Sequence, residues 1–216
     1  MSDLLLSQSL AGSPYQFSAI GIDSLGATEY TLGTVIVDVS GSVHPFKAAL
    51  ERALKEVVKA CQPHNNPRAD NMMLRVLLFN STVTEVHGFK PLPDCKESDY
   101  DNCIHPTGAT SLYDATYNAV EAMIKYGKQL ADQDFDVNAA LFVITDGQDN
   151  VSSASKSMCK SSIESAVTSE ALESIMPVLI GVTPKGSPTS SYLSSFKDEA
   201  GFQQYVQIDS ADEKPW

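Results

Sequence analysis

The stretch Thr34–Ser42, TVIVDVSGS, joins an apolar run to an aspartate and two serines. Residues 34–39 are mostly β-branched and almost continuously apolar, which is typical of a strand buried on both faces of a sheet. Asp38 is then predicted at the carboxyl end of this strand, where open α/β sheets place their ligand crevices. The serines follow on a tight turn with a glycine between them, and small oxygen side chains on such a turn suit a hard cation.

Two later segments also place small oxygen side chains at the ends of predicted elements. Residues 107–115, TGATSLYDA, contain a glycine turn and Thr110, and they lead into an apolar pattern of helical spacing. Residues 139–147, AALFVITDG, form a second buried-strand pattern that ends on Asp146 and a glycine. Three separate segments therefore supply candidate oxygen ligands.

Together the three segments spell D-x-S-x-S…T…D-G in order. On this motif the chain resembles the von Willebrand factor A family with its metal-ion-dependent adhesion site, from about residue 30 to about residue 208. The resemblance implies a bound Mg²⁺, with Mn²⁺ or Ca²⁺ as substitutes, and it implies as metal ligands Asp38, Ser40, Ser42, Thr110 and Asp146. We expect contacts that support these ligands, or contacts with a partner, from Gly41, Gly108, Gly147 and Asp149.

The rest of the chain predicts strands that alternate with helices, and therefore a Rossmann-like, doubly wound α/β fold. We expect a mainly parallel sheet of about six strands with one antiparallel edge strand, and helices on both faces. The short link at residues 80–81 makes its two flanking strands antiparallel neighbours. Strands are expected at 32–39, 72–79, 82–89, 138–145, 173–182 and 204–208, and helices at 45–61, 111–131, 161–172 and 190–200.

The length of 216 residues and the hydrophobic content of 43% suit one domain with a sizeable core. Residues 1–29 are interpreted as an N-terminal arm, with an edge strand at 15–22 as one reading. Residues 30–208 are expected to form the von Willebrand factor A-like domain, with an acidic insert at 94–105 in a long loop. Residues 209–216 are interpreted as a C-terminal tail.

The net charge of −12 argues against nucleic acid and anionic membranes as partners, because both require a basic surface. Basic residues do not cluster along the sequence, and no apolar run approaches the roughly 18 residues of a membrane span. The first ten residues make a poor signal peptide, and the four cysteines lack a C-x-x-C pair. Reduced thiols in a cytoplasmic protein are predicted, with a Cys95–Cys103 bridge as the alternative for an exported chain.

The resemblance implies a metal-dependent protein-binding module in which a partner's Asp or Glu completes the metal shell, as in stand-alone bacterial or phage members. The chain is not expected to be an enzyme. A haloacid dehalogenase-type phosphatase needs a second Asp where Ser40 stands, and the two serines near His44 lack the G-x-S-x-G elbow. Residues 181–187, GVTPKGS, depart from the phosphate-binding loop, because Ser187 stands where that loop needs Lys.

Two other functions are left open by the sequence. One is a Mg²⁺-dependent phosphoryl-transfer enzyme or enzyme subunit that uses the same metal. The other is a structural component in which the metal only holds loops together.

Overall fold

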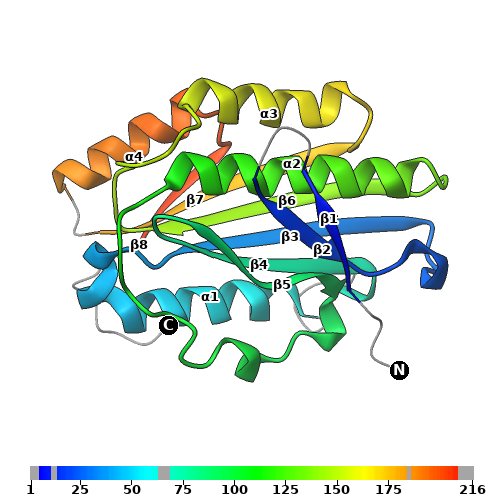
Figure 1. The fold of residues 1–216 in the computed structure, drawn as a ribbon, viewed down its shortest axis with the longest axis horizontal. Coiled ribbons are helices and arrows are strands. Elements are labelled where there is room, and N and C mark those ends of the chain that lie inside the picture. Colours follow the sequence, from blue (N-terminus) through cyan, green and yellow to red (C-terminus); the bar gives the residue numbers. More distant parts are fainter. Residues whose placement is uncertain (1–4, 11–13, 63–68, 184–185, 209–216) are drawn as a thin grey trace.

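The computed structural model describes residues 5–10, 14–62, 69–183 and 186–208. Within them, one sheet has the strand order β1-β2-β5-β4-β3-β6-β7-β8 (Figure 1). The strands are β1 (Leu6–Ser9), β2 (Gln16–Ala19), β3 (Glu29–Asp38), β4 (Met72–Phe79), β5 (Val83–Pro91), β6 (Asp136–Thr145), β7 (Ser174–Val182) and β8 (Gln204–Ile208). The helices are α1 (Lys47–Cys61), α2 (Leu112–Ala131), α3 (Lys156–Thr168) and α4 (Pro188–Glu199). Short 3-10 helices are η1 (Ile22–Ser24), η2 (Gly41–Phe46), η3 (Ala69–Asn71), η4 (Leu92–Asp94) and η5 (Glu97–Tyr100).

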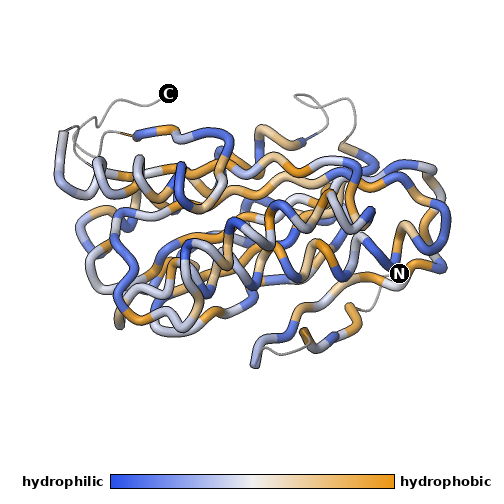
Figure 2. The backbone as a smooth tube through the Cα atoms, turned by 90° about the horizontal axis from the view of Figure 1, so that it is seen from above, coloured by the Kyte–Doolittle hydropathy of each residue, from blue (hydrophilic) through white to orange (hydrophobic). Residues whose placement is uncertain are grey.

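The helices lie on both faces of the sheet, as the alternating sequence pattern predicts. Helix α1 covers one face, and α2, α3 and α4 cover the other (Figure 1). Val35 and Val37 of β3 belong to the core on the α1 side, whereas Leu32 and Ile36 belong to the core on the α2 side. Burial on both faces explains why the sequence of β3 is almost continuously apolar. In the view of Figure 2, the helices alternate between hydrophilic and hydrophobic segments, as amphipathic helices do.

The α/β fold class is confirmed, but the sheet is larger than predicted. Strands β4, β3, β6, β7 and β8 are parallel, and β5 pairs antiparallel with β4, as the short link between them requires. The expectation that this antiparallel strand lies at the edge is wrong, because β2 pairs with β5 and β1 pairs with β2. The described residues contain eight strands rather than six. Strand β1 has only four residues, mostly exposed, and so carries no apolar signal.

The helix boundaries agree with the sequence except at α3. The sequence places this helix at 161–172, whereas it begins at Lys156. The side chain of Ser155 accepts a hydrogen bond from the amide of Met158 at 3.3 Å, which is the arrangement of a helix N-cap. In a segment rich in serine, the capping serine could not be distinguished from the others by sequence alone.

The acidic segment after β5 is packed rather than loose. It contains η4 and η5, and its side chains Leu92, Tyr100 and Ile104 are fully buried in the core beside α1. The N-terminal arm carries β1 and β2, and the predicted tail at 209–216 lies outside the described residues. All four cysteines are free thiols. No helix in the described part of the chain has both the length and the apolar character needed to cross a membrane.

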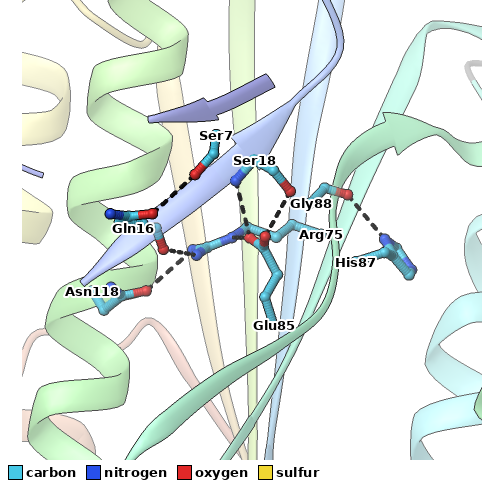
Figure 3. A network of polar contacts seen from close by, with 8 residues as sticks. All are labelled: Ser7, Gln16, Ser18, Arg75, Glu85, His87, Gly88 and Asn118. Atoms are coloured by element: carbon cyan, nitrogen blue, oxygen red, sulfur yellow. Dashed lines mark hydrogen bonds and ion pairs between the residues drawn. The ribbon is translucent and has the colours of Figure 1, made fainter. Parts of the chain in front are cut away.

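A buried polar network attaches the N-terminal hairpin to the sheet (Figure 3). Arg75 of β4 is completely buried, and its Nε donates to Glu85 of β5 at 2.7 Å. Its two terminal nitrogens donate to Asn118 of α2 and to the carbonyl of Gln16 in β2. Glu85 also accepts from the hydroxyl of Ser18 at 2.6 Å, so one ion pair joins β2, β4 and β5. Such a network is costly to leave incomplete, because a buried charge needs its partners.

Candidate functional site

The five predicted ligands converge at the carboxyl ends of β3 and β6. Asp38 ends β3, Asp146 follows β6, and the two central strands run parallel with Val37 beside Ile144. Ser40 is the N-cap residue of η2, and Ser42 lies within η2. Thr110 lies two residues before α2 begins. Adjacent parallel strands end at the same edge of a sheet, which is why residues distant in sequence meet here.

Direct contacts connect four of the five ligand candidates. The hydroxyls of Ser40 and Ser42 are 3.0 Å apart, and Ser42 donates to the carboxylate of Asp146 at 3.1 Å. The carboxylate of Asp38 accepts from the backbone amide of Ser40 at 2.8 Å. The residues therefore form one cluster of oxygen atoms that holds two carboxylates.

Gly147 leaves a space that this cluster surrounds. A Cβ atom at Gly147 would lie 3.5 Å from Ser42 Oγ and 3.9 Å from both Asp38 Oδ2 and Thr110 Oγ1. Oxygen atoms from two separate segments thus face the same small volume beside Gly147 of the third segment, and a Cβ at this position would lie in van der Waals contact with them.

Gly41 and Gly108 bring the two loops together. The amide of Gly41 donates to the carbonyl of Gly108 at 3.0 Å. Gly108 has φ of 76°, a conformation that favours glycine, and a Cβ there would lie 2.8 Å from Ser81 Oγ. These two glycines act through the backbone: they let the loop that carries Thr110 approach the loop that carries the serines.

Burial and charge distinguish the aspartates from ordinary turn residues. Asp38 is 0% exposed and Asp146 is 8% exposed. Within the described residues, neither carboxylate has a salt bridge to a Lys, Arg or His. Burial, followed by the charge of Asp38, raises the pKa of Asp146 to about 6, and burial also raises the pKa of Asp38. Two neighbouring buried carboxylates without a cation cost stability, so the site favours a bound positive charge.

The donor set fits a divalent hard cation. Mg²⁺ and Mn²⁺ accept carboxylate and hydroxyl oxygens and retain water or external ligands in their remaining positions. The described residues contain no group of three or more His, Cys, Asp or Glu side chains that could hold a metal. A metal site among them therefore has to include hydroxyl oxygens. Ser42 is exposed whereas Ser40 and Thr110 are buried, which leaves the cluster open to the surface on one side.

Two further residues support the site, and one of them, Thr145, was not predicted. Thr145, the last residue of β6, donates to Asp38 at 2.6 Å and accepts from the amide of Gly147 at 3.1 Å. The side-chain oxygen of Asn150 accepts a hydrogen bond from the backbone amide of Thr110 at 2.9 Å, and the backbone amide of Asn150 donates to the Thr110 carbonyl. Thr145 directly precedes the Asp-Gly pair and is completely buried, but a buried threonine in a strand gives no distinctive sequence signal.

Asp149 lies beside the cluster and contacts the start of α2. Its carboxylate accepts from the backbone amide of Tyr113 at 3.1 Å and from Ser152. The amide of Tyr113 belongs to the first turn of α2 and has no partner within the helix, so Asp149 satisfies it. Asp149 therefore positions the loop after β6 against the helix that follows Thr110.

The comparisons with known proteins give a fold but no family. No protein-family model matches the chain, and no curated protein matches its sequence. Solved structures do match. The PilB minor pilin from Streptococcus sanguinis has a TM-score of 0.54 at 15% identity, covering 88% of this chain and 59% of that one.

Two further solved structures have the same arrangement. Proximal thread matrix protein 1 from the mussel byssus has a TM-score of 0.57 at 19% identity, covering 86% of this chain and 43% of that one. Manganese-loaded Plasmodium vivax TRAP protein has a TM-score of 0.52 at 17% identity, covering 85% and 69%. The fold is von Willebrand factor A-like. The chain spans about half the length of the first two of these proteins.

Proposed function

We propose that this chain is a metal-dependent protein-interaction module. Asp38, Ser40, Ser42, Thr110 and Asp146 would hold one Mg²⁺, for which Mn²⁺ or Ca²⁺ could substitute, and a partner's Asp or Glu would complete the shell. The observation that carries this proposal is the convergence of these side chains around the space above Gly147.

The chemistry of the cluster explains why a partner carboxylate would bind there. Two carboxylates only just balance the charge of a divalent cation, and the three hydroxyls are weak donors. An additional anionic oxygen is therefore favourable at the metal. The exposed side of the cluster, at Ser42, is where that oxygen could enter.

The proposal extends to the setting of the protein. Four free thiols suit a reducing compartment, so we place the chain in the cytoplasm. The similar structures include a pilin and an adhesin. A binding role agrees with those structures. The proposed cytoplasmic location differs from the location of a pilus protein.

An affinity experiment with a matched control tests the proposal. Immobilised wild-type protein, Thr110→Ala and Thr107→Ala would each be incubated with cell extract in Mg²⁺ or in EDTA, and retained proteins identified by mass spectrometry. Thr107 is an exposed residue of the same loop, so its variant controls for any disturbance there. We expect a partner that wild type and Thr107→Ala retain in Mg²⁺, and that both EDTA and Thr110→Ala release.

Different results would favour the other two functions. A partner retained equally in EDTA and by Thr110→Ala would show that the site only holds loops together. Mg²⁺-dependent turnover in a phosphatase or nucleotidase screen, abolished by Thr110→Ala, would indicate an enzyme. A replacement of each candidate Asp and Glu in a captured partner would then identify the coordinating carboxylate.

A further inference from the structure

We propose that a basic groove beside the metal site binds a run of acidic residues that flanks the partner's metal-coordinating carboxylate. This inference rests on the proposed function and adds a second determinant of partner choice. The groove has a volume of about 500 Å³ and lies along η2 and the first half of α1. Its lining includes His44, Asn102 and four charged residues, Lys47, Glu51, Arg52 and Lys55.

The fold creates a positive cluster that the linear sequence does not show. Lys55 is neutralised, because it contacts Glu51 at 3.1 Å and Asp101 at 2.5 Å. Lys47 and Arg52 line the same groove, and in the described part of the chain neither forms a salt bridge. In a protein of net charge −12, two unpaired cations in one groove form a distinct local feature.

The position of Lys47 on α1 is unfavourable for the isolated helix. Lys47 is the first residue of α1, and the first turn contains no acidic residue. A helix N-terminus carries partial positive charge, so a lysine there lowers helix stability whereas an anion raises it. An external carboxylate in the groove would relieve this repulsion and pair with Lys47 and Arg52. Charge complementarity therefore selects an acidic occupant.

The groove begins close in sequence to the proposed metal site. Its lining residue His44 is two residues after Ser42 in the same 3-10 helix. On its other side is Asn102, whose segment leads to Gly108, and the carbonyl of Gly108 accepts from the amide of Gly41. A partner chain that places one carboxylate on the metal can thus continue directly into the groove. The neighbouring residues of that chain are the ones that Lys47 and Arg52 would contact.

Two designed peptides and one charge reversal test the inference. The first peptide is a Gly/Ser sequence with a single Glu, and in the second three Asp residues follow that Glu. Each is titrated by NMR, in Mg²⁺ and in EDTA, into wild-type protein, Arg52→Glu and Lys128→Glu. Lys128 is exposed in the last turn of α2, and its reversal changes the net charge equally. Both substituted residues are exposed, so both variants should fold, which circular dichroism verifies.

We expect wild type and Lys128→Glu to bind the acidic peptide about three- to tenfold more tightly than the single-Glu peptide in Mg²⁺, as one or two exposed ion pairs would give. Arg52→Glu should remove this preference while retaining Mg²⁺-dependent binding of the single-Glu peptide. The preference should also decrease at high salt.

Three outcomes would overturn the inference. Equal Mg²⁺-dependent affinity for the two peptides would refute the groove and leave the proposed function intact. Loss of Mg²⁺ dependence for both peptides in wild type would refute the proposed function and the inference together. A Mg²⁺-dependent dimer in sedimentation, abolished by Arg52→Glu, would assign the groove to a second copy of the chain.

Discussion

At the residue scale, Asp38 and Asp146 lower the stability of the metal-free protein. Both carboxylates are buried, they lie in one hydrogen-bonded cluster, and no cation among the described residues neutralises them. Their hydrogen bonds to Ser40, Ser42 and Thr145 offset only part of this cost. Buried carboxylates that lower stability until a cation binds are expected at a ligand site. This property distinguishes the two aspartates from ordinary turn residues.

Asp146→Asn should stabilise the metal-free protein at neutral pH and abolish its stabilisation by Mg²⁺. The folded pKa of about 6 lies above the unfolded value near 4, so the folded state retains a proton that the unfolded state has lost. The Asp146 contribution to stability therefore falls as the pH rises from about 4 to 6, by about 3 kcal/mol in total. Melting temperatures at pH 7.5, in EDTA and in Mg²⁺, measure both effects. An unchanged Mg²⁺ shift in the variant would contradict the assignment.

His87 is a half-buried titratable residue that takes no part in the proposed metal site. Its Nδ1 faces the carbonyl of Gly88 at 2.9 Å and must carry the proton, so Nε2 accepts from the hydroxyl of Tyr100 at 2.8 Å. Burial is the main cause that lowers the pKa of His87 from 6.5 to about 4, and Lys90 acts in the same direction. Asp99 and Glu85 act in the opposite direction but do not prevail.

The His87 contribution to stability should decrease as the pH falls from about 6.5 to about 4, opposite in sign to the Asp146 contribution. In this window the unfolded state binds a proton at His87 and the folded state does not, which costs at most about 1.4 kcal/mol per pH unit. Between pH 7 and pH 5, urea unfolding should show His87→Gln becoming more stable relative to wild type. His105→Gln, at an exposed position, serves as the control. Identical pH effects in wild type and His87→Gln would refute this account.

At the element scale, the N-terminal hairpin is attached by side-chain contacts as well as by strand pairing. Strands β2 and β5 share one paired position, Ala19 with Phe89. Phe17 also packs edge-on against Phe89, backbone groups of the hairpin contact Arg75 and Glu85, and Gln8 hydrogen-bonds to Gln129 of α2. The guanidinium of Arg75 also lies 5.9 Å from the centres of both phenylalanine rings.

Glu85→Gln should reduce the free energy of unfolding by about 3 kcal/mol, because it leaves Arg75 buried with no counter-charge. Adding Arg75→Met to this variant should recover part of the loss, since it removes the unpaired charge. Glu56→Gln, at a side chain 59% exposed, should change stability by less than about 0.5 kcal/mol. Urea unfolding measures all three variants. A loss of under 1 kcal/mol in Glu85→Gln would show that the network contributes little.

The element pattern could be predicted from the sequence wherever an element has a strong apolar period. Strand β4 has the predicted bounds, and α2 begins one residue after the predicted start. Strand β1 was missed because its four residues show no alternation of buried and exposed positions. The predicted start of α3 was wrong because Ser155 is the N-cap, and the sequence does not distinguish it from the other serines nearby. In each case a local contact decided the boundary, not the hydrophobic pattern.

At the scale of the whole molecule, the fold explains which parts of the candidate site could be predicted from the sequence and which could not. The candidate ligands could be predicted because each lies at the end of an element with a clear signal, and parallel strands bring those ends together. Thr145 and the groove along α1 could not be predicted. A buried threonine has no distinctive pattern, and Lys47 and Arg52 meet Asn102 only through tertiary packing.

The most direct test of the metal site counts bound Mn²⁺ by electron paramagnetic resonance. Wild-type protein should bind one Mn²⁺ per chain, and Mg²⁺ should displace it. Ser42→Ala should weaken the affinity at least tenfold, because Ser42 contacts both Ser40 and Asp146 in the cluster. Ser157→Ala, at an exposed serine of α3, should bind as wild type does. No binding by wild type at millimolar Mn²⁺, or equal binding by Ser42→Ala, would contradict the account.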